Sequence, residues 1–422
     1  MIQWNGLMVF FLAVFAASAL VQGGLKWLNI RHLRRYGQDV PEVLKGEIDA
    51  ETLAKISRYT VDSSRLGSIE NLFDDAATLC VLLTGLLPWL LAHLPPWENH
   101  FILVGLLFFS ILSVASGILG LPFDLYGTFV IERRYGFSTI TFRLWIADLL
   151  KGFAISAILM GILLGAFLAL MCFTPRAWWL WTWLVFASFQ LLMLWLYPIV
   201  IAPLFNKYEP IRDEELKAGI VALMGKVGLK TQGVYQVDQG KRSRHTNAYF
   251  TGLGKTKRIV LFDTLLASHT AEEIVAVLAH EIGHWKKRHI VKQLVFMEAA
   301  SLAVLWLASH LIAWPLLYTT FGFSRPVPFV GLLLAAAVFG PLTILLTPFV
   351  AAIQRRYERQ ADDTVSALTG TTLPLASALK RLAKDNLANL HPHPHYARFY
   401  YSHPPLVERI TRLQALDRGK GA

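Results

Sequence analysis

The sequence contains few charged residues and very little cysteine. Charged residues fill 16% of its 422 positions, whereas an ordinary soluble domain carries about 25%. The two cysteines, Cys80 and Cys172, both lie inside long apolar runs, so they supply neither a disulfide framework nor a cysteine-rich zinc knuckle. The composition therefore excludes an ordinary soluble enzyme and a small scaffold held together by cysteines.

The sequence contains long apolar runs. Hydrophobic residues make up 55% of the chain, and its mean hydropathy is +0.46. Seven runs reach the roughly 20 residues that a helix needs to cross a bilayer. They lie at residues 7–25, 76–94, 101–121, 153–173, 179–201, 294–317 and 329–353. The sequence thus predicts a mainly α, polytopic membrane protein with seven transmembrane helices.

Lysine and arginine are distributed unevenly between these runs. They are frequent at residues 26–75, 122–152 and 202–290, and absent from the turn at 95–100. Because cytoplasmic loops of membrane proteins are enriched in these residues, the frequent segments should face the cytoplasm. The net charge of +11 then marks cytoplasmic loops and not a nucleic-acid partner. The same bias predicts that the first run is an uncleaved anchor, with a cleaved signal peptide as the alternative.

The most informative short motif is H-E-x-x-H at residues 280–284. On a helix, His280 and His284 lie one turn apart on the same face, where two imidazoles can bind one Zn²⁺. Glu281 lies beside them, where it can take a proton from a zinc-activated water and pass it to the leaving amine. Chance is the alternative, but the apolar run at 275–279 favours a buried helix.

The segment between the fifth and sixth runs carries the signals of a folded insertion. Asp213 predicts a helix start, residues 233–237 and 258–262 predict short strands, and residues 252–254 predict a turn. A further helix should begin near Thr270, carry the motif and continue toward the sixth run. We therefore expect a cytoplasmic, gluzincin-like zinc protease domain that contains a small β-sheet.

The predicted spans and the predicted insertion divide the chain into four parts. They are membrane helices 1–5 with their loops (residues 1–201), the catalytic insertion (202–290), membrane helices 6–7 (291–353) and a C-terminal part that completes the zinc site (354–422).

A catalytic zinc site needs a third protein ligand, and three glutamates follow the motif: Glu298, Glu358 and Glu408. Glu298 falls within the sixth run, whereas Glu358 lies just past the seventh, back on the cytoplasmic side. Topology therefore favours Glu358, and Glu408 stays open on sequence alone. Asp362 shares the helical face of Glu358 and could accept the free N–H of a ligating histidine. A solvated face paired with nearby arginines is the alternative for both.

Four further residues are candidates for contact with a substrate. His403 and Arg409 could donate to the oxyanion of a tetrahedral intermediate, and an unrelated surface histidine and arginine are the alternative. Asn247 and Ala248 lie on an expected edge strand that could pair with an extended peptide. An ordinary hairpin strand is the alternative there.

Several sequence blocks, in one order along nearly the whole chain, resemble the type I CAAX prenyl endopeptidases, which are integral-membrane zinc metalloproteases. These blocks lie at residues 131–138 with Thr141, 203–208, 245–249, 259–263 and 280–284, at Glu358 with Ala361 and Asp362, and at 402–404 with Arg409. Together they are much more specific than H-E-x-x-H alone.

The resemblance implies seven helices around a water-filled chamber, with one Zn²⁺ at its cytosolic end. It implies Glu358 as the third ligand, Asn247 and Ala248 as contacts to the substrate backbone, and His403 and Arg409 as lining. The implied activity is endoproteolysis near the C-terminus of a prenylated CAAX protein. The compact chain suggests a bacterial-type member in the inner membrane, with its active site facing the cytoplasm.

Three other functions compete with this one. A membrane-protein quality-control protease of HtpX-like role would use the same zinc chemistry on peptide or protein substrates without a prenyl group. A site-2-type protease would bury its motif in lipid, which the basic segment at residues 285–289 argues against. The third is a non-enzymatic membrane chamber or transporter with a vestigial zinc site.

Overall fold

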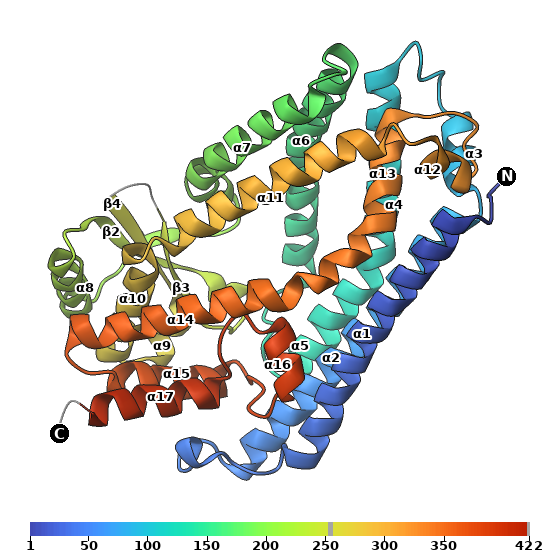
Figure 1. Cartoon of the computed structure of the whole chain (residues 1–422). Coiled ribbons are helices and arrows are strands. Elements are labelled where there is room, and N and C mark those ends of the chain that lie inside the picture. Colours follow the sequence, from blue (N-terminus) through green and yellow to red (C-terminus); the bar gives the residue numbers. More distant parts are fainter. Residues whose placement is uncertain (252–255, 420–422) are drawn as a thin grey trace.

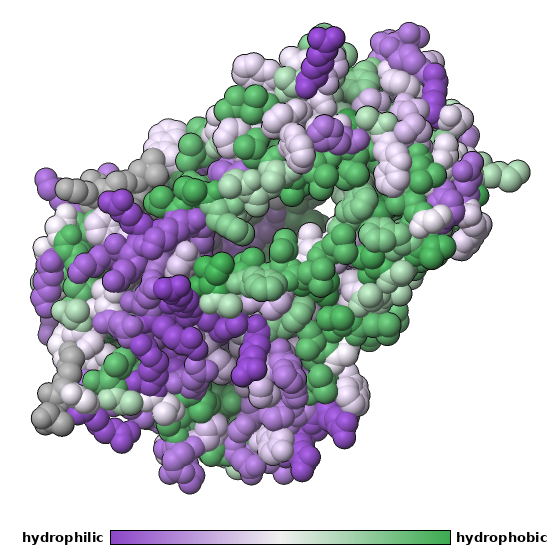
Figure 2. All heavy atoms as spheres, in the orientation of Figure 1, coloured by the Kyte–Doolittle hydropathy of each residue, from purple (hydrophilic) through white to green (hydrophobic). Residues whose placement is uncertain are grey.

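The computed structural model describes residues 1–251 and 256–419, and its chain forms two regions. The span region, residues 6–204 and 289–345, consists of long helices. The mixed region, residues 208–286 and 347–418, holds the sheet and most of the shorter helices, at the left of Figure 1. Figure 2 shows apolar residues spread over the span region and polar residues gathered over the mixed region.

The span region contains the predicted transmembrane helices. Among the described residues, six helices are long and apolar enough to cross a membrane, and a pair bent by 58° makes a seventh if it forms one broken span. The elements are α1 (Gly6–Tyr36), the bent pair α2 (Ala50–Leu83) and α3 (Leu86–Ala92), α4 (Phe101–Tyr126), α5 (Glu132–Arg134), α6 (Phe142–Phe173), α7 (Trp178–Leu196), α11 (His289–Leu311), α12 (Pro315–Thr320) and α13 (Pro328–Phe339). The prediction of a mainly α, polytopic membrane protein is confirmed, with six to seven such helices in the described residues.

Two of the predicted runs are bent or interrupted near their middle. The second bends at Gly85, whose φ of 79° is left-handed and easily adopted only by glycine. The seventh is interrupted after α13 by a 3₁₀ segment, Gly340–Leu345, and resumes as α14 (Thr347–Thr369). Pro341 and Pro348 lie at these junctions, and each removes a backbone N–H that a continuous helix would need.

The mixed region is built around the predicted small sheet. Its strands are β1 (Tyr208–Pro210), β2 (Lys230–Val237), β3 (Ala248–Thr251) and β4 (Thr256–Phe262), in the order β1-β2-β4-β3, so β3 is an edge strand. Its helices are α8 (Glu214–Lys226), α9 (Asp263–Ser268), α10 (Ala271–Lys286), α14, α15 (Leu373–Asp385), α16 (Pro394–Tyr400) and α17 (Leu406–Arg418). Asp213 caps α8 as expected. The turn predicted at residues 252–254 lies outside the described residues.

Helix α10 begins where the sequence predicted. The Thr270 side chain accepts from the Glu273 backbone N–H, and the Glu273 carboxylate accepts from the Thr270 N–H, which forms a capping box. The Glu273 carboxylate also receives hydrogen bonds from Ser377 and Arg381 of α15. The start of α10 is therefore fixed to the C-terminal part of the chain.

The end of α10 differs from the prediction of one helix that continues into the sixth span. Helix α10 stops at Lys286, and α11 starts at His289. Between them Arg288 has a left-handed backbone with φ of 56°, which breaks the i→i−4 hydrogen-bond ladder. The prediction was wrong here because nothing in the residue types marks an arginine for this conformation.

Candidate metal centre

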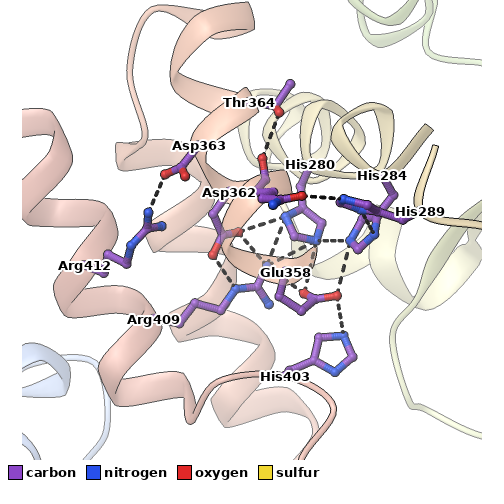
Figure 3. Close-up of polar contacts among 11 residues, drawn as sticks. His280, His284, His289, Glu358, Asp362, Asp363, Thr364, His403, Arg409 and Arg412 are labelled. Atoms are coloured by element: carbon purple, nitrogen blue, oxygen red, sulfur yellow. Dashed lines mark hydrogen bonds and ion pairs between the residues drawn. The ribbon is translucent and has the colours of Figure 1, made fainter. Parts of the chain in front are cut away.

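Helices α10 and α14 bring three metal-binding side chains together. The Nε2 atoms of His280 and His284 lie 3.2 Å apart. Glu358 of α14 places Oε2 3.4 Å from Nε2 of His280 and Oε1 3.2 Å from Nε2 of His284. Figure 3 shows the Glu358 carboxylate pointing at both imidazoles. The three donor groups lie within 4.8 Å of one another and can hold a metal ion.

Gly283 explains how the two helices come so close. A Cβ atom at this position would lie 2.8 Å from Cα of Ala361 and 2.9 Å from its carbonyl oxygen. Both contacts are with backbone of α14, so no side-chain rotation could relieve them. A glycine between the two histidines thus permits the helix contact that delivers Glu358.

The geometry of the donor set fits zinc. Two ligand atoms at about 2.0–2.1 Å from a tetrahedral Zn²⁺ are about 3.3 Å apart, close to the separations between the donors here. Two imidazoles and one carboxylate are also the donor types of a catalytic zinc site. Burial opposes ionisation of Glu358, but its contacts with the imidazoles of His280 and His284, and the nearby charge of Arg409, outweigh burial and hold the pKa of this carboxyl well below its usual range. The carboxylate is therefore ready to bind a cation.

Of the three glutamates considered as ligands, Glu358 is the one that joins the histidines. Glu408 is half exposed, and its Oε1 lies 2.9 Å from Nη2 of Arg359. Glu298 lies on α11 in the span region, where its backbone carbonyl accepts a hydrogen bond from Trp183 of α7. Glu358, which topology favoured, is thus the glutamate that lies beside the histidines, and its role as a zinc ligand stays a prediction.

A buried ion pair supports His280. Nδ1 of His280 lies 2.8 Å from Oδ1 of Asp362, which is fully buried. Arg409 donates to both oxygens of this carboxylate, from Nε at 2.9 Å and from Nη2 at 2.7 Å. Burial raises the pKa of Asp362, but the bonds from Arg409 and His280 lower it to about 2. An ionised Asp362 keeps a proton on Nδ1, so Nε2 presents a lone pair to a metal.

His403 and Arg409 occupy different positions at this centre. Nε2 of His403 lies 3.2 Å from Oε1 of Glu358, and its side chain is 59% exposed. The guanidinium of Arg409 is buried, and its Nη2 lies 3.5 Å from Oε2 of Glu358. His403 therefore borders the open side of the centre, whereas Arg409 lies behind it, paired with Asp362.

A cleft of about 580 Å³ is lined by residues 246–248 and by the segment that carries His403, and it meets the centre at His403 and Arg409. Its apolar lining residues are Leu265, Val277, Leu379, Leu382 and Leu406. The carbonyl of Asn247 accepts a hydrogen bond from Phe262 of β4, so the carbonyl of Ala248, one residue further, points to the open edge of the sheet. The edge-strand prediction is confirmed for Ala248, the first residue of β3, whereas Asn247 lies just before the strand.

Comparisons with known proteins cover the whole fold. A family model described as CAAX prenyl protease N-terminal, five membrane helices, matches residues 29–207, and one described as Peptidase family M48 matches residues 210–417. CAAX prenyl protease 1 of Saccharomyces cerevisiae is 35% identical and covers 93% of this chain and 93% of its own. The chain belongs to the CAAX prenyl protease family.

Other members of the CAAX prenyl protease family agree with this assignment. The crystal structure of S. mikatae Ste24p superimposes with a TM-score of 0.90 at 31% identity, and the match covers 97% of this chain and 100% of that one. The CAAX prenyl protease 1 homolog of Homo sapiens is 30% identical over 92% of this chain and 91% of its own. A CAAX prenyl protease with this fold is an integral-membrane zinc metalloprotease. The HtpX-like role and the vestigial transporter are not favoured.

Sequence reasoning about this CAAX prenyl protease missed two residues at the centre. Nδ1 of His289 lies 3.2 Å from Nδ1 of His284, and Nε2 of His289 lies 2.9 Å from Oε1 of Gln360. The signal was a third histidine five positions after the motif. It went unused because a continuous helix would have turned that side chain away from His284.

Proposed function

We propose that this chain cleaves a peptide bond near the C-terminus of a membrane-associated protein, using one Zn²⁺ held by His280, His284 and Glu358. The convergence of these three donors, beside a cleft that is lined by His403, Arg409 and the edge-strand residue Ala248, carries the proposal. Zinc bound there would polarise the scissile carbonyl and lower the pKa of a water toward about 7.

Glu281 is the proposed general base. It follows His280 on α10 and is half-buried, outside the group of three donors. A carboxylate in this position can take a proton from the attacking water and return it to the leaving amine. Its negative charge also interacts with the guanidinium of Arg409.

His403 and Arg409 are proposed to serve the oxyanion in two different ways. His403 is the more exposed, so its Nε2 can reach a substrate carbonyl in the cleft. Arg409 acts from behind the centre, where it keeps Asp362 ionised and thereby orients His280. This assigns the direct contact to His403 and the supporting role to Arg409.

Asn247 and Ala248 are the proposed contacts to the substrate backbone. The Ala248 carbonyl at the free edge of β3 can accept a hydrogen bond from an extended peptide, which would add a strand to the sheet. The Ala248 N–H now donates to Oδ1 of Asn247 at 2.8 Å, so that side chain would turn to release it. The apolar lining of the cleft suits the aliphatic residues of a CAAX tail.

The substrate and the compartment follow by analogy. The printed names of the relatives describe CAAX prenyl proteases, so a prenylated C-terminal peptide is the proposed substrate. We place the active site on the cytoplasmic side, because Lys and Arg are concentrated on that side of the spans. The bacterial inner membrane stays a prediction from the compact sequence, and the relatives named above are eukaryotic.

Cleavage of a farnesylated CAAX peptide, compared with the same peptide unmodified, tests this proposal. We expect the purified full-length protein to cleave the farnesylated peptide. A zinc chelator should abolish cleavage, and Glu281→Gln should slow it by about 10²–10⁴-fold. Equal cleavage of both peptides would contradict the prenylated substrate class but not the peptidase chemistry. Chelator-resistant cleavage would contradict the metal mechanism itself.

A further inference from the structure

His289 is a buried histidine that the mechanism above does not use. It is the first residue of α11 and is 1% exposed. The left-handed backbone of Arg288 separates α11 from α10 immediately before it. Its ring stacks on Tyr357 of α14, with centroids 4.1 Å apart and planes inclined by 10°. A polar ring enclosed in this way must have its nitrogens satisfied from within the protein.

Both nitrogens of this ring have partners. Nδ1 lies 3.2 Å from Nδ1 of His284, and Nε2 lies 2.9 Å from Oε1 of Gln360. His284, His289 and Gln360 thus form one hydrogen-bonded row that ends at a proposed zinc ligand. Figure 3 shows His289 beside His284, on the side away from Glu358.

The direction of each hydrogen bond follows from the last acceptor. An amide oxygen can only accept, so Nε2 of His289 carries the proton and its Nδ1 is an acceptor when the ring is neutral. Nδ1 of His284 must then be the donor. His284 consequently has its lone pair on Nε2, the atom that faces His280 and Glu358. The reverse order would put a proton on that Nε2 and block metal binding.

We propose that His289 and Gln360 are positioning residues that fix the metal-binding tautomer of His284. They do for His284 what Asp362 and Arg409 do for His280, but with neutral groups. This inference rests on the proposed ligation of zinc by His284. It assigns a role to the break at Arg288, which lets His289 face back toward the centre.

The test measures zinc affinity of the full-length protein in detergent, by competition with a chromophoric chelator. His289→Phe keeps a ring for Tyr357 but removes the acceptor, and we expect zinc to bind about 10–100-fold more weakly. His289→Asn offers an oxygen near the position of Nδ1 and should restore most of the affinity. His310→Phe, the same change near the far end of α11, is the matched control and should bind like wild type.

Gln360 provides a second measurement that does not alter the histidine. Gln360→Glu keeps a hydrogen-bond acceptor and should retain zinc affinity. Gln360→Met removes the acceptor and should weaken zinc binding, as His289→Phe does. The visible spectrum of bound Co²⁺ should change in the same two weakened variants. Unchanged thermal midpoints of the metal-free variants would confirm that folding is intact.

Three results would overturn the inference. One is wild-type zinc affinity in both His289→Phe and Gln360→Met. Another is an equal loss of zinc affinity in His289→Phe and His289→Asn, which would mean that the His289 ring acts only by packing. The third is weaker binding in Gln360→Glu than in Gln360→Met. A wild-type protein that binds no zinc, or a His284→Ala variant that keeps its zinc, would instead refute the proposed metal site.

Discussion

The span region and the mixed region use apolar residues in opposite ways. In the most apolar windows of the spans formed by α7 and α11, no residue is buried inside the protein. In α10, by contrast, eight of the residues are buried, and they include His280 and Gly283. Lipid accepts apolar side chains that water would expel, so the spans need few internal contacts. Close packing occurs in both regions, since α1, α4 and α13 bury an apolar cluster of their own, but the precise placement of donor atoms belongs to the mixed region.

This difference predicts where substitutions will matter. Changes at the α10–α14 contact should alter chemistry or metal binding, whereas comparable changes on lipid-facing helices should be tolerated. The predictions below compare one position of each kind, or a site residue with a neighbour outside the site.

The largest effect should come from Glu281→Gln. Loss of the general base should lower the cleavage rate by about 10²–10⁴-fold, while zinc content stays at the wild-type level. Glu272→Gln, in the exposed first turn of the same helix, is the matched control and should remain active. Normal turnover by Glu281→Gln in a single-substrate assay would remove Glu281 from the mechanism.

The next effect concerns metal content. Glu358→Gln should lose bound zinc, because the negatively charged donor of the three is replaced by a neutral amide, which is a weak ligand. Glu408→Gln breaks only an exposed pair with Arg359 and should keep its zinc. Elemental analysis of both purified variants decides the matter, and the opposite pattern would move the third ligand to Glu408.

Gly283→Ala should have a smaller but measurable effect. The new Cβ would meet the backbone of Ala361, and such overpacking should lower the free energy of unfolding by about 1–3 kcal/mol and also weaken zinc binding. In the span region, a Cβ at Gly161 of α6 would meet nothing within 4 Å. Gly161→Ala should therefore leave the thermal midpoint and zinc affinity unchanged. Equal effects of the two changes would contradict the contrast between the regions.

The smallest expected effect is on thermal stability as a function of pH, and it concerns a residue pair at the junction of the two regions. Nε2 of His245 lies 3.2 Å from Oε2 of Glu132 in α5, and this hydrogen bond raises the pKa of His245 above 6.5. A raised pKa contributes stability that is complete below pH 6.5 and is lost as pH rises through the folded value. The thermal midpoint should thus fall slightly on the alkaline side, and Glu132→Gln should reduce that fall. An unchanged pH profile in the variant would rule out this pair as its source.

Much of this arrangement could be predicted from the sequence. Hydropathy located the spans because lipid selects for length and composition alone. The start of α10 followed from Thr270 and Glu273, whose capping bonds are local. The choice of Glu358 over Glu298 followed from topology, since only one of them returns to the side of the motif.

The missed features depend on contacts between distant segments. The break at Arg288 places a non-glycine residue at positive φ, which no local preference indicates. The row from His284 through His289 to Gln360 exists only because α14 packs against both α10 and the start of α11. The sequence shows that His289 and Gln360 are present, but not that they contact His284. The four-part division of the chain and the roles of the site residues stay predictions.

Helix α14 carries Glu358, Gln360 and Asp362 within little more than one turn. Glu358 faces the Nε2 atoms of the two histidines. Gln360 hydrogen-bonds to His289 behind His284, and Asp362 contacts Nδ1 of His280. A small slide or rotation of α14 would therefore disturb all three at once. Helix α14 follows directly from the seventh span. A movement of the membrane helices that shifts α14 should therefore change the zinc affinity of the site.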